Sequence, residues 1–256
     1  MKMMSVQLPK QTEADTHIIP LADLHMGDAQ SNARLISALL ERIKTEEHTY
    51  CLLGGDLMNT AIATSVSDSY SEQLTPMEQI ERCVATFGPI KHKILAVVGG
   101  NHEARVWKTA GIDMTKLFCQ QLGIANRYSD STAFVFVHTG ENAQKRKHNY
   151  TIYMTHGSGG GRAWGGKINR LVDYSNIVDA DIYVCGHTHS PAIVRQKYFR
   201  PSRSNDSLVE VDRLFVNTAS ALEYGGYGDV QGYHPGSNQY PEIVLCNKEK
   251  HAYAIL

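Results

Sequence analysis

Residues 17–25 read HIIPLADLH, an apolar run that ends in an aspartate and a histidine one residue apart. The apolar part has the length and composition of a buried β-strand, so the sequence predicts that Asp23 lies at the end of this strand. Leucine and isoleucine side chains then recur at helical spacing between Asn32 and Glu47, which predicts a helix. A strand followed by a helix is therefore expected near the start of the chain.

The order of strand and helix then repeats. Residues 50–53 and 93–98 are further apolar runs, and Pro76 is placed to open a helix between them. This alternation predicts a sheet with crossover helices, and such sheets bind ligands at the carboxyl ends of their strands. Polar side chains follow the three strands, at Asp23, Asp56 and Asn101.

The second half of the chain consists mainly of strand-like segments. The predicted strands are residues 133–138, 150–155, 181–185, 192–198, 208–216, 243–246 and 251–256. Helices are predicted near residues 114–122 and 167–177. We expect these strands to complete a second sheet that packs face to face on the first, with helices outside. The predicted fold class is α/β.

The composition is that of a globular protein with an ordinary core. Of the 256 residues, 42% are hydrophobic and 20% are charged, and no linker or internal repeat is visible. We therefore expect a single domain over residues 1–256. No segment is long and apolar enough to cross a bilayer, so no membrane partner is expected. The formal net charge of −1 gives no general electrostatic reason to bind nucleic acid, although a local basic patch would allow it.

The cysteines indicate a reducing environment. They are odd in number, far apart and mostly set among apolar neighbours: Cys51, Cys83, Cys119, Cys185 and Cys246. No Cys-x-x-Cys pair occurs, so buried reduced thiols are the expected state. The first residues also lack the apolar core of an export signal, and we expect a cytoplasmic protein.

Five short clusters carry the side chains that could bind metal. They are Asp23-Leu24-His25, Gly55-Asp56, Gly100-Asn101-His102-Glu103, Thr155-His156-Gly157 and Gly186-His187-Thr188-His189. Carboxylate, imidazole and amide ligands suit manganese, iron or zinc, whereas a structural zinc site favours thiolates. Residues two apart on an extended strand end point to the same side, so each Asp-x-His or His-x-His pair can bind one ion. Glycines before three clusters allow sharp turns and close backbone approach.

The series resembles the motifs of the calcineurin-like metallophosphoesterases, which it matches in order from residue 23 to residue 189. The resemblance implies a four-layer αββα sandwich with a binuclear metal centre between two mixed sheets. It implies three ligands for each metal and one bridging carboxylate: Asp23, His25 and His189 for the first, Asn101, His156 and His187 for the second, and Asp56 between them. His102 would contact the phosphate and protonate the leaving oxygen. Glu103 would orient a ligand.

The expected cofactors are two divalent ions, manganese first, with iron or zinc as alternatives. Two such ions carry four positive charges, and the two carboxylates supply only two negative ones. The site would therefore keep a net positive charge that attracts phosphate. The expected reaction is in-line attack of a metal-bound hydroxide on a phosphodiester, with nucleic acids and nucleotides as candidate substrates. A phosphomonoesterase is the nearest alternative, and a non-catalytic binding scaffold is the alternative from another class. The oligomeric state is left open.

Residues 157–170 form a glycine-rich segment with basic side chains at Arg162, Lys167 and Arg170. The segment approaches a nucleotide-binding P-loop, but Ile168 stands where that motif needs a hydroxyl. We expect this segment to lie at the edge of the active site and to contact substrate through these three cations. The alternative is that the segment is a mobile surface loop. Trp164 would stack on a base or cover the helix.

A second glycine-rich segment contains several tyrosines, between residues 224 and 236. It follows residues 214–217, which have the character of the final core strand. Loops of this length in compact domains are often functional. Its tyrosines would line a nucleotide pocket or an oligomer contact.

Overall fold

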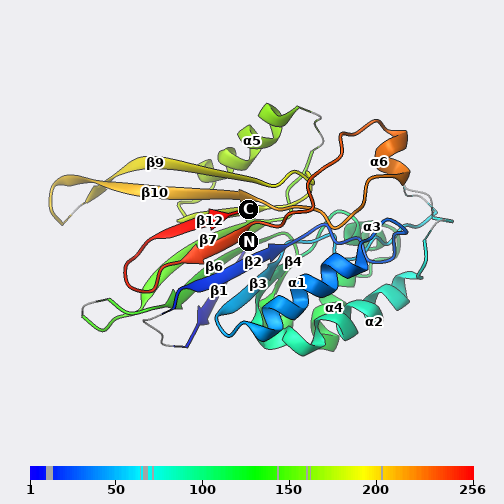
Figure 1. Cartoon of the computed structure of the whole chain (residues 1–256), viewed down its shortest axis with the longest axis horizontal. Helices are drawn as coiled ribbons and strands as arrows, with labels where there is room; N and C mark the ends of the chain where they lie inside the picture. Colours follow the sequence, from blue (N-terminus) through cyan, green and yellow to red (C-terminus); the bar gives the residue numbers. More distant parts are fainter. Residues whose placement is uncertain are drawn as a thin grey trace.

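Two six-stranded β-sheets lie at the centre of the molecule, and helices cover their outer faces (Figure 1). The computed structural model describes residues 1–9, 14–63, 65, 69–70, 72–142, 144–159, 161, 163–202 and 204–256. The arrangement is the expected four-layer αββα sandwich of the α/β class.

The first sheet has the strand order β12-β11-β2-β3-β4-β5. Its strands are β2 (Thr16–Leu21), β3 (Thr49–Leu53), β4 (Ile94–Val98), β5 (Tyr128–Ser129), β11 (Glu242–Leu245) and β12 (Ala252–Ile255). Strands β2 to β5 run parallel to one another, and β11 pairs with β2 in the antiparallel sense.

The second sheet has the strand order β1-β6-β7-β8-β10-β9. Its strands are β1 (Lys2–Gln7), β6 (Thr132–Thr139), β7 (His148–Thr155), β8 (Ile182–Cys185), β9 (Ala192–Ser202) and β10 (Ser207–Asn217). Strands β7, β8 and β10 are parallel, whereas β6 and β9 are antiparallel to their neighbours β7 and β10.

The helices begin and end where local chemistry favours it. The α-helices are α1 (Ala33–Thr45), α2 (Pro76–Phe87), α3 (Glu103–Ala110), α4 (Met114–Leu122), α5 (Trp164–Asp173) and α6 (Gly226–Val230), and the 3₁₀ turns are η1 (Gly88–Lys93), η2 (Ala125–Arg127) and η3 (Tyr174–Asn176). The Asn32 side chain caps α1 by accepting from Leu35 N. Thr75 and Glu78 form a capping box around Pro76 at the start of α2.

Three separate apolar layers hold the sandwich together. Strand β3 illustrates the alternation, because Cys51 and Leu53 face α1, α2 and α4, whereas Tyr50 and Leu52 face the second sheet. In β8, Ile182 and Val184 face the first sheet, and the outer side chains of this strand pack near α5. Central strands such as β3 and β8 therefore bury both faces, which explains their continuous apolar runs in the sequence.

Two expectations about the strands are wrong. Strands β11 and β12 belong to the first sheet and not to the second, because β11 pairs with β2 through Ile243 and Ile18. Consequently residues 214–217 are not the final core strand, since Glu242–Leu245 is fully buried as well. Several elements were not expected: β1, which has one buried side chain at Met4, the two-residue strand β5, the short helices α3 and α6, and the 3₁₀ turns η1 and η2. Helix α6 lies in the segment that was expected to be a loop.

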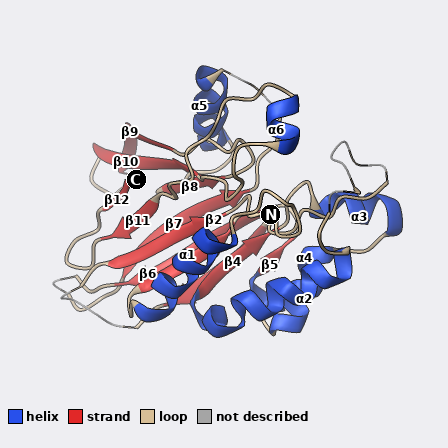
Figure 2. Ribbon diagram, turned by 45° about the vertical axis from the view of Figure 1, so that its right-hand side comes forward, coloured by secondary structure: helices blue, strands red, loops and turns tan. Residues whose placement is uncertain are grey.

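The carboxyl ends of β2, β3, β4, β7 and β8 are each followed by a loop that carries one of the five polar clusters. Figure 2 shows α5 and α6 standing together on one side of the sheets. Within the described ranges, no helix has the length and apolar character needed to cross a membrane.

Candidate metal centre

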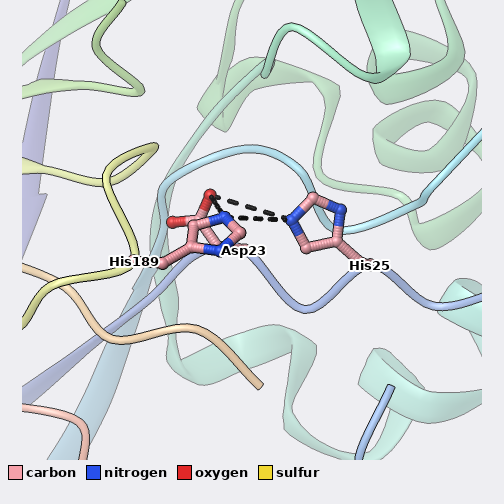
Figure 3. Close-up of side chains that lie close together, drawn as sticks. All are labelled: Asp23, His25 and His189. Carbon is pink, nitrogen blue, oxygen red and sulfur yellow. Dashed lines mark hydrogen bonds and ion pairs between the residues drawn. The ribbon is translucent and has the colours of Figure 1, made fainter. Parts of the chain in front are cut away.

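The first group of candidate ligands is Asp23, His25 and His189 (Figure 3). Asp23 Oδ1 lies 3.2 Å from His189 Nε2 and 4.0 Å from His25 Nε2. The two Nε2 atoms are 3.3 Å apart, and the rings meet edge to face. Three donor atoms from loops after β2 and β8 therefore point at one small volume.

The second group is Asp56, His156 and His187, together with Asn101. His156 Nε2 lies 3.2 Å from Asp56 Oδ2 and 2.9 Å from Asn101 Oδ1. Asn101 Oδ1 is also 2.8 Å from His187 Nδ1. Loops after β3, β4, β7 and β8 therefore contribute oxygen and nitrogen donors to a second small volume.

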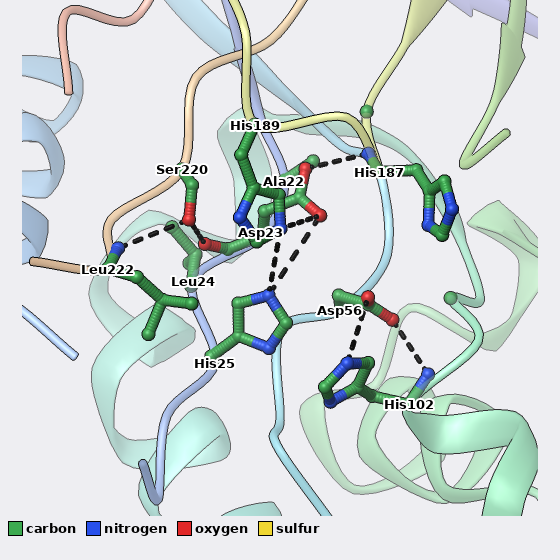
Figure 4. A network of polar contacts seen from close by, with 12 residues as sticks. Ala22, Asp23, Leu24, His25, Asp56, His102, His187, His189, Ser220 and Leu222 are labelled. Carbon is green, nitrogen blue, oxygen red and sulfur yellow. Dashed lines mark hydrogen bonds and ion pairs between the residues drawn. The ribbon is translucent and has the colours of Figure 1, made fainter. Parts of the chain in front are cut away.

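Asp56 lies between the two groups. Its carboxylate belongs to the set with His156 and His187, and it also forms a set with His25 and His102 in which all ligand atoms lie within 4.8 Å of one another. Figure 4 shows its side chain between His25 and His102 on one side and His187 on the other. The Asp56 carboxylate is therefore within reach of both groups of side chains.

The backbone at these residues has an uncommon conformation. Among the described non-glycine residues, eight have positive φ, and five of these are candidate ligands: Asp23, His25, Asp56, His187 and His189. Their φ values lie between 47° and 69°. Left-handed backbone costs energy in non-glycine residues and gathers at functional sites. The paired ligands are therefore not on extended strand ends, as expected from the sequence, but on left-handed turns after the strands.

The loops interlock through their backbones and carboxylates. A Cβ at Gly100 would lie 2.1 Å from Asp56 Oδ1, and a Cβ at Gly186 would lie 2.8 Å from Asp23 Oδ2. His187 N also donates to Asp23 Oδ2 at 2.9 Å. These glycines therefore allow one loop to approach the carboxylate of another.

Asp23 is fully buried, and its Oδ1 has no hydrogen bond of good geometry from a described residue, although His189 Nε2 lies 3.2 Å away. A buried carboxylate oxygen without a hydrogen bond is costly unless a cation compensates it. Oδ1 is also the atom that faces His25 and His189. The residues at this position therefore fit a metal ion.

Burial sets the charge state of the imidazoles. It lowers the pKa of His25 well below the usual value, and it lowers the pKa of His187. These rings are neutral at pH 7, as metal ligands must be. His156 differs, because the Asp56 charge overcomes burial and raises its pKa to about 10. A cation at this position would compete with the proton on His156.

Glu103 supports the second group from behind. Its buried carboxylate accepts hydrogen bonds from the backbone amides of Asp56, Leu57, Met58 and Gly100, at 2.7 to 3.1 Å. Burial, reinforced by the Asp56 charge, raises the pKa of Glu103 to about 7. The side chain fixes the loops of Asp56 and Asn101 relative to each other, which agrees with the orienting role expected for it.

His102 lies on the wall of the cleft with its two ring nitrogens in different surroundings. Nδ1 is 3.0 Å from the carbonyl oxygen of Asn59, so Nδ1 carries the proton and donates. Nε2 accepts from the guanidinium of Arg105 at 2.9 Å and lies 3.8 Å from Asp56 Oδ2. His102 is therefore beside the candidate ligands.

Three residues that sequence reasoning did not select contribute to the site. Asn59 contacts both His25 and His102, Arg105 contacts His102, and Ser220 donates to the carbonyl of Asp23 at 3.0 Å. Arg105 follows His102 by three residues on α3, so a helix expected there would have placed the two together. No local pattern marks Ser220, which follows a different strand.

A cleft of about 560 Å³ opens over these side chains. Lys167 lines it, and its Nζ donates to Thr188 O at 3.1 Å and to Ser190 Oγ at 2.5 Å. Arg170 instead hydrogen-bonds Ser158 and is absent from the described lining of the cleft. Arg162 lies outside the described residues. Of the two expected substrate contacts that lie in the described residues, Lys167 lines the cleft and Arg170 does not.

Comparison with known proteins assigns the class. Residues 16–191 match the family model described as calcineurin-like phosphoesterase, which covers more than half of the chain. The chain belongs to the calcineurin-like phosphoesterase family. This family binds divalent metal ions, and the described residues contain candidate ligand clusters for them. No curated protein has a significantly similar sequence.

Two solved structures are similar over nearly their whole length. Wild-type Vps29 from Entamoeba histolytica, complexed with Zn²⁺, has 13% identity and a TM-score of 0.44, with 94% of this chain and 98% of that chain covered. A conserved protein from Streptococcus pneumoniae, described as a "predicted phosphoesterase", has 13% identity and a TM-score of 0.40, with 95% and 99% covered.

Proposed function

We propose that the chain is a phosphodiesterase that uses two divalent metal ions. The observation that carries this proposal is the convergence of donor atoms from five loops on two adjoining volumes, with Asp56 between them. The proposed ligands share oxygen or imidazole donors and comprise Asp23, His25, Asp56, Asn101, His156, His187 and His189. Asp23, His25 and His189 would hold one ion, and Asn101, His156 and His187 the other.

Divalent cations bound there would lower the pKa of water and offset the charge that builds up on a phosphate in an in-line displacement. The chain supplies the remaining functions. His102 would take up a proton from solvent at Nε2, which lies 3.8 Å from Asp56 Oδ2, and would pass that proton to the leaving oxygen. Because Arg105 now donates to that same atom, phosphate binding must draw the guanidinium away from His102.

Arg105 is therefore proposed to bind a non-bridging phosphate oxygen. Its guanidinium lines the cleft and stands one helical turn from His102. A guanidinium makes strong charge-assisted hydrogen bonds with phosphate. When the Arg105 guanidinium moves from His102 to the phosphate, it would bind the substrate. The same movement would free His102 Nε2 of this hydrogen bond.

The extent of the cleft supports a diester. It continues past the candidate ligands, with residues of α5 on one wall and residues 222–238 on another. A phosphodiester carries a substituent on each side of its phosphorus, and these walls would contact the substituents. Nucleic acids and nucleotides are the proposed substrates.

Manganese is the metal that we propose for the assay, because the mixed carboxylate, amide and imidazole ligands suit it. Purified protein with Mn²⁺ should hydrolyse bis(p-nitrophenyl) phosphate faster than p-nitrophenyl phosphate. Asp56→Asn should abolish this activity, whereas His92→Ala, which changes an exposed histidine outside the site, should retain it.

Other outcomes would assign other functions. A strong preference for the monoester would make the protein a phosphomonoesterase. Failure to hydrolyse any of a broad set of phosphoesters at saturating Mn²⁺ would leave a binding scaffold.

A single domain and a cytoplasmic location stay predictions. In support of the location, the cysteines are free and four of the five are buried, which suits a reducing compartment.

A further inference from the structure

Aromatic side chains stand in the cleft beyond the metal centre. Trp164, Tyr224 and Tyr233 all line it, and their exposed fractions are 57%, 51% and 39%. Large apolar rings are costly to expose, and a group of them in one cleft marks a binding surface. None of these three rings belongs to a candidate metal ligand.

Trp164 is held in position relative to the histidine loop. It is the first residue of α5, and Lys167 on the next turn ties this helix to Thr188 O and Ser190 Oγ. Lys167 Nζ also lies 5.7 Å from the centre of the Trp164 ring. The helix that carries Trp164 is therefore hydrogen-bonded to the loop that carries His187 and His189.

The tyrosines come from a different segment, which also lines the cleft. A Cβ at Gly236 would lie 2.6 Å from the carbonyl oxygen of His189, so the segment that follows Tyr233 packs directly on the loop. Tyr224 belongs to a segment held by Glu223, whose amide donates to Gln30 O at 2.9 Å. Aromatic rings from two separate segments thus flank the residues that would bind metal.

We infer that the rings of Trp164, Tyr224 and Tyr233 bind a nucleobase of the substrate, with Trp164 as the main stacking surface. The inference rests on the proposed function, because it places the base next to a phosphate held at the metal centre. A nucleotide joins a planar ring to an anion, and the cleft offers flat rings together with the cations Lys167 and Arg105. Stacking on aromatic side chains accepts any base, so broad base tolerance is expected.

The chain contains two tryptophans, which permits a direct test. Trp107 is 59% exposed, similar to Trp164, but is absent from the described lining of the cleft. In Trp107→Phe, Trp164 is the sole tryptophan, and adenosine 5′-monophosphate should quench its fluorescence in the Zn²⁺-loaded protein. Ribose 5-phosphate, which lacks the base, should not. In Trp164→Phe, the remaining Trp107 should not respond to either compound.

Affinity gives a second readout. Trp164→Ala should weaken binding of adenosine 5′-monophosphate by on the order of 10-fold in calorimetry and leave binding of ribose 5-phosphate unchanged. Tyr233→Ala should weaken the nucleotide in the same direction. The control is Tyr253→Ala, because Tyr253 is 37% exposed on β12 and does not appear among the described cleft residues.

Equal affinity for the nucleotide and for ribose 5-phosphate would overturn the inference. So would quenching of Trp107 to the same extent as Trp164. If Trp107→Phe protein hydrolyses bis(p-nitrophenyl) phosphate but shows no base-dependent quenching, the inferred base site is wrong and the proposed activity stands. If it shows base-dependent quenching without hydrolysis, the proposed activity is wrong and the base site stands.

Discussion

At the scale of single residues, the candidate ligands combine common metal-binding side chains with a left-handed backbone that few aspartates and histidines adopt. Aspartate, asparagine and histidine after apolar runs pointed to a metal centre, and the structure brings these side chains together. The left-handed conformation at Asp23, His25 and Asp56 has no comparable signature. Aspartate and histidine are several-fold enriched at positive φ, but this conformation is uncommon even for them, so contacts between loops must select it.

The division of labour between ligands and His102 yields a paired prediction. His102→Ala should retain bound metal but lower turnover on the order of 10²–10⁴-fold, as expected for loss of a general acid. Asp56→Asn should lose metal, because it removes the charge proposed to be shared by two ions. Metal content by mass spectrometry and kcat under saturating Mn²⁺ would measure both, and equal metal loss in the two variants would contradict the assignment.

Arg105 gives a second prediction at this scale. Arg105→Met should lower kcat/KM for a diester by roughly 10- to 100-fold, because a charge-assisted hydrogen bond to phosphate is lost. Metal content should not change. The matched control is Lys108→Met, an exposed cation on the same helix that does not line the cleft in the described structure. Unchanged kcat/KM in Arg105→Met would exclude the proposed phosphate contact.

At the scale of elements, strands and helices with strong local patterns were predicted closely. The helix starts expected at Asn32 and Pro76 agree with the structure, in which the Asn32 side chain caps α1 and Pro76 is the first residue of α2. Helix α3 was missed because it is short and begins inside the metal cluster at Glu103. Strand β11 was expected as a strand but in the wrong sheet, since a local apolar run does not specify its partner.

An ion-pair network contributes to the position of β11. Arg42 on α1 contacts Glu242 at 2.7 Å and Glu46 at 2.9 Å, and His17 on β2 also contacts Glu242. Burial alone would raise the pKa of Glu242, but hydrogen bonds from Arg42 and His17 outweigh it and lower the value below 4.5. Because the folded-state pKa is depressed, this stabilisation is present above pH 4.5 and is lost as pH falls through the folded-state value.

Arg42→Met should therefore lower the free energy of unfolding at pH 7 by about 1 kcal/mol, a modest value because Arg42 is partly exposed. The difference from wild type should shrink as the pH falls below about 4. Urea unfolding at both pH values would measure it. Lys44→Met removes only an exposed pair with Glu41 and should have a smaller effect. A deficit for Arg42→Met that is independent of pH would argue against the network.

At the scale of the whole molecule, the sandwich was expected from the alternating strands and from the family resemblance. The pairing of β11 with β2 was not, because it joins residues more than 200 positions apart. The segment between β10 and β11 connects the two sheets. It places Ser220 against Asp23 and residues 222–238 at the cleft. The metal centre therefore depends on both sheets.

Metal binding should consequently stabilise the whole molecule. At a Mn²⁺ concentration about 100 times the dissociation constant, the midpoint of thermal unfolding should rise by on the order of 5–10 °C relative to protein in EDTA. Asp56→Asn should lose most of this shift. Calorimetry would measure it, and an unchanged midpoint in wild-type protein would mean that no ion binds the folded state preferentially.

The central claim is that two neighbouring cations bind where the five loops meet. Anomalous diffraction at the manganese edge, from crystals grown with Mn²⁺, tests it most directly. We predict two peaks about 3.5–4 Å apart. One should contact Asp23, His25 and His189, the other Asn101, His156 and His187, with Asp56 reaching both. A single peak, or peaks away from these side chains, would contradict the claim.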